Sequence, residues 1–326
     1  MKIVIFEKRP YEETIITNFE KENNIEIIST EKILDKNTLN LCKGADAITT
    51  LGRSILNKNM LDKIKDLGVK FIATRTVGYN HYDIDYAKSI GLKVCNVSYA
   101  PNGVADFTVM LMLIAIRKYK PAMWRQNVND YALNGLMGRE MKDLTVGVLG
   151  TGRIGSTVIN NLSGFGCKIL AYDVFKNEHI KDKAQYVELD ELLKNSDIIT
   201  IHMPLNEKNK NIINKETISK MKNGVVLINT ARGELMNISD LIEGIETEKI
   251  GALALDVFEN EDEIYHHNRA NDILKNRDMA YLRQFPNVIL TQHMAFFTDS
   301  ATNEMISNSL NNILSFKQTG TCKNEL

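Results

Sequence analysis

The fold class that this sequence predicts is α/β with parallel sheets, and three observations predict it. Short β-rich runs alternate with helical stretches along almost the whole chain. The length of 326 residues corresponds to about two domains. A glycine signal also recurs, since Gly68, Gly91 and Gly166 each follow a helical stretch and precede a strand, as helix C-caps do.

The strands are expected where short, mostly apolar and β-branched runs occur. These runs are Lys2–Phe6, Ile25–Ile28, Ala47–Leu51, Lys70–Thr74, Lys93–Val97, Thr145–Leu149, Lys168–Tyr172, Asp197–Ile201, Val225–Asn229, Ile250–Leu255 and Asn287–Leu290.

Two longer helical patterns and one mixed stretch complete the chain. Gly103–Arg117 is nearly all apolar, which predicts a buried interdomain helix with Met110 and Met112 as core residues. Thr298–Lys317 has an amphipathic helical pattern. The stretch from Tyr119 to Asp143 has two open interpretations, an arm that packs on a second subunit or a peripheral helix of the same one.

Composition and charge indicate an ordinary globular protein and disfavour some classes of partner. Hydrophobic residues make up 44% and charged residues 25% of the chain, as in ordinary globular proteins. The net charge is -1, with 40 basic and 41 acidic residues well mixed, which disfavours nucleic acid or an anionic membrane as the main partner.

Cysteine usage and the first residues indicate a cytoplasmic protein. The cysteines at 42, 95, 167 and 322 are scattered, which is typical of reduced thiols rather than of a disulfide framework or a zinc site, so no metal is expected. The chain enters a strand-like run at once, and no apolar run approaches the ~18 residues of a membrane span.

A glycine loop predicts dinucleotide binding. Gly150, Gly152 and Gly155 follow an apolar strand and precede a helix, and Asp173 closes the next strand. The glycines let backbone N–H groups approach a pyrophosphate, and Asp173 would bind the ribose hydroxyls and repel a 2′-phosphate. We therefore expect NAD rather than NADP, a preference that Lys176 could soften. The alternative is a plain glycine turn with Asp173 as a capping residue.

Three further polar residues follow strand-like runs in the second half of the chain. They are Arg232, Glu261 and His293. An enzyme that reduces a 2-keto acid needs a cation for the carboxylate, a general acid and a carboxylate that keeps this acid protonated. The bland alternatives are a structural ion pair, a solvated acid and a core histidine. His266 and His267 are interpreted as exposed loop residues rather than metal ligands.

The motifs together resemble a known family. "VGVLGTGRIG", "INTARGEL", "ALDVFENE" and "LTQHMAFFT", in this order, resemble the D-isomer-specific 2-hydroxyacid dehydrogenases, and the D-lactate dehydrogenase branch most of all. The stretch that begins "TRTVGYNHYDIDYAK" also resembles D-lactate dehydrogenases found with vancomycin resistance. The likeness covers essentially the whole chain.

The resemblance implies two doubly wound, Rossmann-like parallel-sheet domains with the active site in the cleft between them. Residues 1–98 plus 297–326 would form a discontinuous substrate (catalytic) domain, and residues 99–296 the NAD-binding domain. The family usually forms homodimers, which favours the arm interpretation of the stretch from Tyr119 to Asp143.

The resemblance also implies residue roles. Arg232 would bind the substrate, Glu261 (rather than Glu259) would be the carboxylate partner, and His293 would be the proton donor. Amides of Val77 and Gly78 would grip the substrate carboxylate, and Tyr99 would border the pocket. Besides the loop glycines, the cofactor would touch Arg153, Ile154, Asp173, Met203, Pro204, Asn209, Thr230, Ala231 and Asp256.

Two departures from the family pattern stand out. Gln292 replaces the proline that usually precedes the catalytic histidine, which frees one backbone N–H beside His293. The vancomycin-associated relatives lack an acid at the position of Asp173, so their cofactor preference does not transfer directly.

The expected function is NADH-dependent reduction of a 2-keto acid to the D-2-hydroxy acid, with pyruvate to D-lactate as the leading reaction. Larger branched or aromatic acids, such as 2-ketoisocaproate and phenylpyruvate, are the first alternative. An NAD-sensing regulatory protein on the same fold is an alternative of another class, which the short termini disfavour. Oxidation of 3-phosphoglycerate or formate is a third possibility, and Arg53 is a candidate for the extra cation that a phosphoglycerate enzyme would need.

Overall fold

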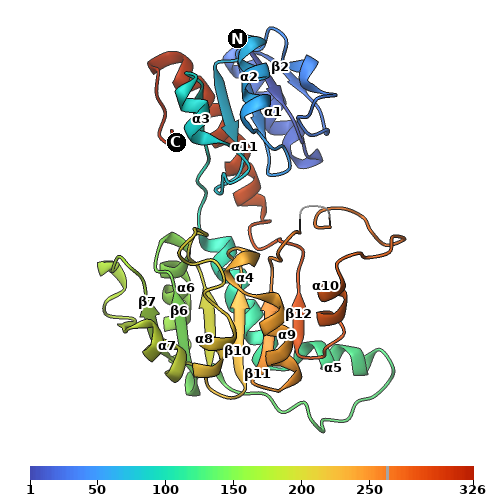
Figure 1. The fold of residues 1–326 in the computed structure, drawn as a ribbon, viewed down its shortest axis with the longest axis vertical. Coiled ribbons are helices and arrows are strands. Elements are labelled where there is room, and N and C mark those ends of the chain that lie inside the picture. Colours follow the sequence, from blue (N-terminus) through green and yellow to red (C-terminus); the bar gives the residue numbers. More distant parts are fainter. Residues whose placement is uncertain (262–263) are drawn as a thin grey trace. The chain divides into compact units, whose positions relative to one another are not determined.

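The computed structural model describes residues 1–261 and 264–326 and divides into two compact units (Figure 1). Unit 1 comprises Met1–Ala100 and Phe297–Leu326, and unit 2 comprises Pro101–Phe296. The chain thus leaves unit 1 after Ala100 rather than after residue 98. Both units are parallel-sheet α/β structures, which confirms the predicted fold class.

Unit 1 is built on a five-stranded parallel sheet with the order β2-β1-β3-β4-β5. The central strands β1, β3 and β4 are buried on both faces, as a parallel sheet covered by helices requires, whereas the edge strand β2 has no buried residue. The last helix of the chain, α11, packs against β4 and so completes a unit begun by the N-terminus. The elements are β1 (Lys2–Ile5), α1 (Glu13–Asn23), β2 (Glu26–Ser29), β3 (Ala47–Thr50), α2 (Lys58–Asp66), β4 (Phe71–Thr74), α3 (Ile84–Ser89), β5 (Lys93–Cys95) and α11 (Asp299–Thr319).

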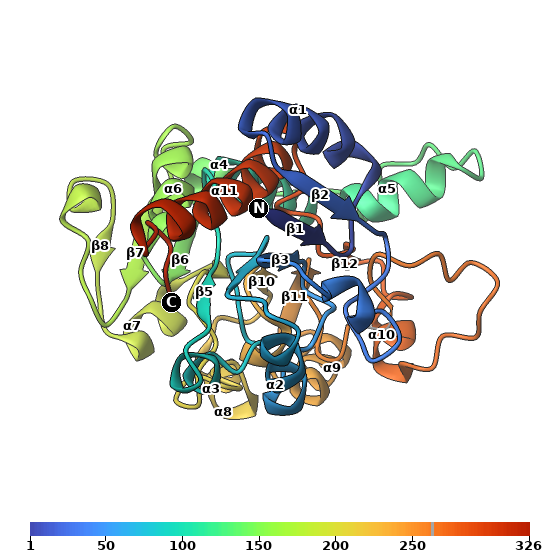
Figure 2. The same cartoon turned by 90° about the horizontal axis from the view of Figure 1, so that it is seen from above.

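Unit 2 is built on a seven-stranded parallel sheet with the order β12-β11-β10-β9-β6-β7-β8. Figures 1 and 2 show α4 and α6 on one face of this sheet and α8 and α9 on the other. The elements are α4 (Asn102–Ile116), α5 (Tyr119–Gln126), β6 (Thr145–Leu149), α6 (Arg153–Ser163), β7 (Lys168–Tyr172), β8 (Gln185–Tyr186), α7 (Leu189–Asn195), β9 (Ile198–Ile201), α8 (Lys215–Lys220), β10 (Val225–Asn229), α9 (Ile238–Glu246), β11 (Ile250–Leu255), α10 (Arg277–Leu282) and β12 (Val288–Leu290).

Both sheets reverse their winding direction at one point. In unit 1 the reversal lies between β1 and β3, and in unit 2 it lies between β6 and β9. In open parallel sheets, ligands bind outside the carboxyl ends of the strands at such a switch point. The loops that leave β1, β3, β6 and β9 are therefore the first places to look for function.

The strand predictions are confirmed, and each predicted run contains or overlaps a strand. The capping glycines Gly68, Gly91 and Gly166 adopt φ values of 95°, 81° and 73°, in the left-handed region that the prediction required. Strand β8 was not predicted. The prediction for Met110 is wrong: its side chain is exposed on α4, whereas Met112 on the opposite side is buried.

The stretch after α4 is largely exposed. Helix α5 has no buried residue, and Figure 2 shows it extending outward with the loop that follows. Leu133 and Met137 in this loop are 82% and 87% exposed. Among the described residues, no helix is long and apolar enough to cross a membrane.

Candidate active site

The glycine loop of unit 2 forms a cradle between β6 and α6. A side chain at Gly155 would place its Cβ 1.9 Å from the Gly150 carbonyl oxygen, so only glycine lets α6 start this close to the loop. Gly150 has φ 92°, and its position faces the backbone of His202 on the β9 loop. A Cβ at Gly152 would meet nothing within 4 Å. The loop is thus tightly packed at Gly150 and Gly155 and open at Gly152.

The open side of this cradle fits a dinucleotide. Helix α6 begins at Arg153 with Gly152 as its N-cap, so no side chain caps the amides of its first turn. Uncapped amides at the positive end of a helix bind an anion such as a pyrophosphate. Gly150, Gly152, Arg153, Ile154 and Gly155 would hold the phosphates of NAD here.

Asp173 lies just after β7 and is tied to the glycine loop. One carboxylate oxygen accepts a hydrogen bond from the Thr151 amide at 2.5 Å, and the other accepts one from the Phe175 amide at 3.1 Å. The side chain is half-buried, so lone pairs remain for ribose hydroxyls. Lys176 lies 5.8 Å from the ring centre of Tyr186.

The β9 loop contributes the opposite side of the switch point. His202, which follows β9, bonds through Nε2 to the Thr200 hydroxyl at 2.9 Å, and burial lowers its pKa to about 3. It is therefore a neutral structural histidine. Met203 is half-buried and Pro204 exposed. The Asn209 side chain donates to the Pro204 carbonyl at 2.6 Å, so it shapes this loop.

Arg232 follows β10 on a loop that the neighbouring side chains hold. The Asn229 side chain donates to the Arg232 carbonyl at 2.8 Å and accepts from the Ala231 amide at 2.9 Å. The hydroxyls of Thr230 and Thr108, on α4, are 2.9 Å apart. The half-buried Arg232 guanidinium donates a hydrogen bond to the Ala231 carbonyl at 2.6 Å. Among residues 1–261 and 264–326, no carboxylate lies within ion-pair distance of it. This cation is thus available to an anionic ligand.

Gly233 explains how the Arg232 loop meets the loop after β11. A Cβ at Gly233 would lie 2.3 Å from the Phe258 carbonyl carbon and 2.4 Å from the Glu259 nitrogen. The bare glycine lets the two loops pass in contact. Because β10 and β11 are adjacent strands, Arg232 and the segment that leads to Glu261 leave the sheet side by side.

Glu261 and His293 form the centre of the site. His293 Nδ1 hydrogen-bonds to Glu261 Oε1, and Glu261 Oε2 accepts from the Phe258 amide at 2.6 Å. The two side chains are 32% and 17% exposed, so the pair is half-sheltered from water. With Nδ1 committed to the carboxylate, Nε2 is the ring nitrogen left for a ligand. A histidine held in this way can give or take one proton.

Asp256 holds the loop that carries His293. It is fully buried, and its carboxylate accepts hydrogen bonds from the Thr291 hydroxyl (2.5 Å) and from the Met294 (2.9 Å) and Ala295 (2.8 Å) amides. Its carbonyl accepts the His293 amide at 2.7 Å. His293 has φ 52°, a conformation that costs energy for a residue with a side chain. These four bonds hold it there.

Two neighbours of His293 refine the sequence analysis. Gln292 is exposed and makes no hydrogen bond in the described part of the chain, so Glu261 and Asp256, and not Gln292, orient the histidine. His266, interpreted from sequence as an exposed loop residue, is exposed but also lies 3.1 Å through Nε2 from the His293 carbonyl oxygen. Neither this contact nor the bond between Thr291 and Asp256 could be predicted from the sequence, because in each case the two residues are well separated along the chain.

Unit 1 carries a second candidate site after β4. The Thr76 hydroxyl donates to the Gly78 carbonyl at 2.6 Å, and the Asn96 side chain donates to the Val77 carbonyl at 2.7 Å. The amides of Val77 and Gly78 have no acceptor within the residues that the structure describes. Two adjacent, unpaired N–H groups make a small anion site. Tyr99, which follows β5, is half-buried.

The chain resembles proteins of known activity. The model of the family "D-isomer specific 2-hydroxyacid dehydrogenase, NAD binding domain" matches residues 109–295. An aromatic 2-oxoacid reductase of Clostridium sporogenes is 44% identical over all of this chain and 99% of its own length.

Solved structures give the same result. A D-lactate dehydrogenase from Sporolactobacillus sp. has a TM-score of 0.86 and 34% identity, over 100% of this chain and 99% of that one. A D-isomer-specific 2-hydroxyacid dehydrogenase from Lactobacillus delbrueckii ssp. bulgaricus, solved with NAD, has a TM-score of 0.88 and 30% identity over the full length of both chains. With its glycine cradle and its histidine–glutamate pair, this chain belongs to the NAD-dependent D-isomer-specific 2-hydroxyacid dehydrogenases.

Proposed function

We propose that the protein reduces a 2-oxo acid to the D-2-hydroxy acid with NADH, and that pyruvate, which gives D-lactate, is its substrate. The observation that carries this proposal is the Glu261–His293 hydrogen bond at the carboxyl edge of the unit 2 sheet. The guanidinium of Arg232, which has no ion-pair partner among the described residues, supplies the charge that a 2-oxo acid requires.

The residues divide the reaction as follows. NADH, when bound, supplies the hydride that the substrate carbonyl carbon receives. The forked guanidinium of Arg232 binds the carboxylate and the carbonyl oxygen, and the Val77 and Gly78 amides bind the carboxylate. His293 gives the proton on Nε2 to the carbonyl oxygen, which becomes the hydroxyl. Glu261 keeps a proton on Nδ1 and stabilises the imidazolium before this transfer.

Residues of unit 2 would hold the cofactor. The amides at the start of α6 would bind the pyrophosphate, and Asp173 the adenosine ribose. Asp256, beyond its bonds to the His293 loop, would lie at the nicotinamide carboxamide. The remaining contacts of this proposed cofactor site come from Met203, Pro204, Asn209, Thr230 and Ala231.

An aromatic 2-oxo acid is the second candidate substrate, because the Clostridium sporogenes relative at 44% identity is named for that class. The test is NADH oxidation by the purified protein with pyruvate and phenylpyruvate in parallel. A higher kcat/KM for pyruvate supports D-lactate formation, and a higher value for phenylpyruvate moves the protein to the aromatic class. No turnover on either, despite NADH binding, contradicts the dehydrogenase proposal.

The role of Arg232 has its own test. Arg232→Leu should abolish turnover and leave the Kd for NADH near normal, because the cation binds the substrate. Arg139→Leu is the matched control, since Arg139 pairs with Asp197, which directly precedes β9 at the amino edge of the same sheet. Retained turnover in Arg232→Leu would refute the assignment.

We further propose that the protein is a cytoplasmic homodimer in which the arm after α4 packs on a second copy of the chain. The exposed apolar side chains of Leu133 and Met137 would be covered there, and so would Met110, which lines a groove with Phe165 between α4 and α6. Light scattering should give twice the chain mass. The double variant Leu133→Lys/Met137→Lys should give the single mass, and Ile273→Lys, also at an exposed apolar position, should stay dimeric.

A further inference from the structure

Glu7 is a buried carboxylate at the switch point of unit 1. It lies two residues after the end of β1, is fully buried, and has φ 56°, a strained conformation for a glutamate. Charged side chains are almost never buried without partners, because removing a charge from water is costly. The partners of Glu7 therefore indicate what it is there to hold.

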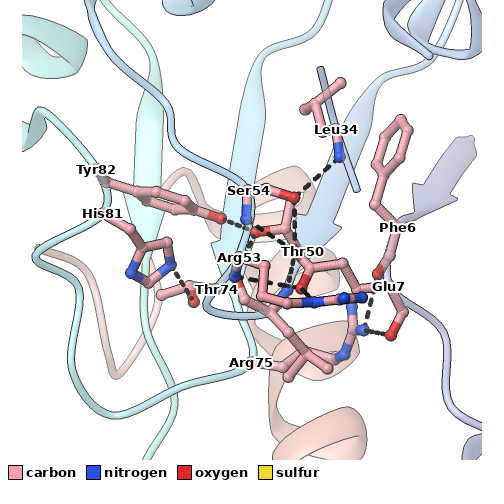
Figure 3. Close-up of polar contacts among 11 residues, drawn as sticks. Phe6, Glu7, Leu34, Thr50, Arg53, Ser54, Thr74, Arg75, His81 and Tyr82 are labelled. Atoms are coloured by element: carbon pink, nitrogen blue, oxygen red, sulfur yellow. Dashed lines mark hydrogen bonds and ion pairs between the residues drawn. The ribbon is translucent and has the colours of Figure 1, made fainter. Parts of the chain in front are cut away.

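Within the described residues, the hydrogen bonds to the Glu7 carboxylate come from one loop, the segment 51–54 that follows β3, whereas Arg75 binds the Glu7 main-chain carbonyl (Figure 3 labels Arg53, Ser54 and Arg75). Oε1 accepts from the Leu51 amide (3.2 Å), the Ser54 amide (3.1 Å) and the Ser54 hydroxyl (2.5 Å). Oε2 accepts from the Arg53 amide (3.2 Å) and from Arg53 Nε (3.4 Å). One carboxylate thus fixes the course of a four-residue loop.

This loop lies beside the segment that carries the Val77 and Gly78 amides. Strands β3 and β4 are hydrogen-bonded neighbours, and the Arg75 amide continues the ladder to the Thr50 carbonyl at 2.8 Å. Beyond the ends of β3 and β4, a Cβ added at Gly52 would lie 3.9 Å from Thr76 Cγ2. The segment 51–54 therefore runs close to Thr76, whose hydroxyl donates to the Gly78 carbonyl.

A second set of contacts braces the same two loops. The Thr50 hydroxyl lies 2.7 Å from the Tyr82 hydroxyl, and the Thr74 hydroxyl lies 2.6 Å from that of Thr76 (Figure 3 labels Thr50, Thr74 and Tyr82). His81 Nε2 lies 3.2 Å from the Thr74 hydroxyl. These hydrogen-bonding groups connect the segment 51–54 with the segment that carries the Val77 and Gly78 amides. Among the groups named here, Glu7 supplies the one carboxylate.

We propose that Glu7 is a positioning residue for substrate binding: its carboxylate holds the segment 51–54 against Thr76 and so keeps the Val77 and Gly78 amides directed at the substrate carboxylate. The proposal rests on the proposed function, because it assigns the 2-oxo acid to these amides. Glu7 itself touches neither substrate nor cofactor, and its effect passes through the two loops.

The test is a set of steady-state measurements on Glu7→Gln. The Gln amide group would bring N–H donors toward the donors of either Arg53 or Ser54, so the segment 51–54 must shift. We expect the KM for the 2-oxo acid to rise about tenfold or more, since small displacements of a binding loop have large effects. The values of kcat and of the Kd for NADH should change by less than about threefold, which is the pattern of lost ground-state binding.

Two further variants keep the test decisive. Ser54→Ala removes one donor to Glu7 and keeps the carboxylate, so it should raise KM in the same direction by less, and it serves if Glu7→Gln does not fold. Asp46→Asn is the matched control, because Asp46 accepts the Lys2 amide at 2.8 Å just before β3, at the opposite edge of the same strands. It should leave KM unchanged.

The outcomes separate the two claims. A raised KM in Glu7→Gln and Ser54→Ala, with Asp46→Asn at the wild-type value, supports the positioning role. An unchanged KM in both, or an equal rise in Asp46→Asn, overturns it while the proposed function stands. If the wild-type protein reduces no 2-oxo acid, the proposed function fails, and the role of Glu7 in substrate binding falls with it.

Discussion

The two units share a doubly wound topology but use their switch points in opposite ways. In unit 2, glycines leave the space between the ends of β6 and β9 open on one side. In unit 1, the corresponding place between β1 and β3 is filled by Glu7 and the donors that surround it. The unpaired amides of unit 1 accordingly lie one strand further along, after β4.

This difference shows that topology offers a position for a ligand and that side chains decide whether it is used. Glycines without Cβ atoms keep one switch point free for a large, anionic cofactor. A buried carboxylate at the other switch point supports a binding loop on the next strand.

The largest effect is expected at the glycine cradle. Gly155→Ala would put a Cβ 1.9 Å from the Gly150 carbonyl oxygen, so both the free energy of unfolding and NADH affinity should fall, the affinity by about a hundredfold or more. In Gly152→Ala the added Cβ meets no atom within 4 Å, so the variant should fold normally. Its methyl group would nevertheless occupy the place proposed for the pyrophosphate at the start of α6, so NADH affinity should fall. NADH titration by fluorescence, with thermal unfolding alongside, checks both.

A control for the cradle is Gly164→Ala, at the C-terminal end of α6. The nearest atom to its added Cβ is the Asn161 carbonyl oxygen at 3.7 Å, which is ordinary contact. Its affinity and stability should match the wild type. Normal NADH binding by Gly152→Ala would contradict the placement of the pyrophosphate.

The second effect is expected at Asp256. In Asp256→Asn one carboxylate oxygen becomes an NH2 group, which would face a backbone amide of Met294 or Ala295. The His293 loop should loosen, with a loss of roughly 1–3 kcal/mol in the free energy of unfolding for the unsatisfied group. We expect kcat to fall about a hundredfold, within the range for a misplaced general acid. Denaturant unfolding and steady-state rates measure the two effects, and an unchanged kcat would show that the clamp is dispensable.

The fold could be predicted in nearly every element, and the reason is local. A strand buried on both faces needs a run of apolar, β-branched residues, and a helix that ends on a left-handed residue needs glycine, so both leave signals within a few residues. Strand β8 (Gln185–Tyr186) could not be predicted, because two residues are too few to show the alternating pattern of a strand. Met110 was misjudged because α4 is apolar all round, so its pattern does not reveal which side is exposed.

The site could be predicted only in part, and the missing part is not local. The glycine spacing and the polar residues after strands identified the residues that geometry brings together, Glu261 and His293 among them. The contacts that hold them join distant segments, such as Asp256 with Thr291 and Glu7 with Ser54. A buried carboxylate in a sequence looks the same as an exposed one, so its partners emerge only from the fold.

A smaller effect is expected in unit 1 from Thr76→Val. The change removes the hydroxyl that holds the Gly78 carbonyl and keeps the shape of the side chain. The KM for the 2-oxo acid should rise by roughly three- to tenfold, as expected for the loss of one hydrogen bond of about 1 kcal/mol that orients the loop. NADH affinity should not change, because the cofactor residues belong to unit 2, and a change in NADH affinity alone would refute this division of labour.

The smallest effect is expected from His266→Ala. His266 supports only the carbonyl of His293, whereas Glu261 and Asp256 hold its ring and its amide. The kcat should fall by about two- to fivefold, the effect of losing one exposed hydrogen bond. Single-turnover rates with the wild type and His266→Ala measure this, and a loss as large as that in Asp256→Asn would make His266 a main support of the site.

The most direct test of His293 as the proton donor of a D-specific reduction is chiral analysis of the product that the wild-type protein makes from NADH and a 2-oxo acid, with the His293→Ala variant measured in parallel. We expect the wild type to form only the D-2-hydroxy acid, and His293→Ala to bind NADH but to form product at least about a hundredfold more slowly. Formation of the L-isomer, or undiminished turnover in His293→Ala, would contradict the assignment of His293 as the proton donor of a D-specific dehydrogenase.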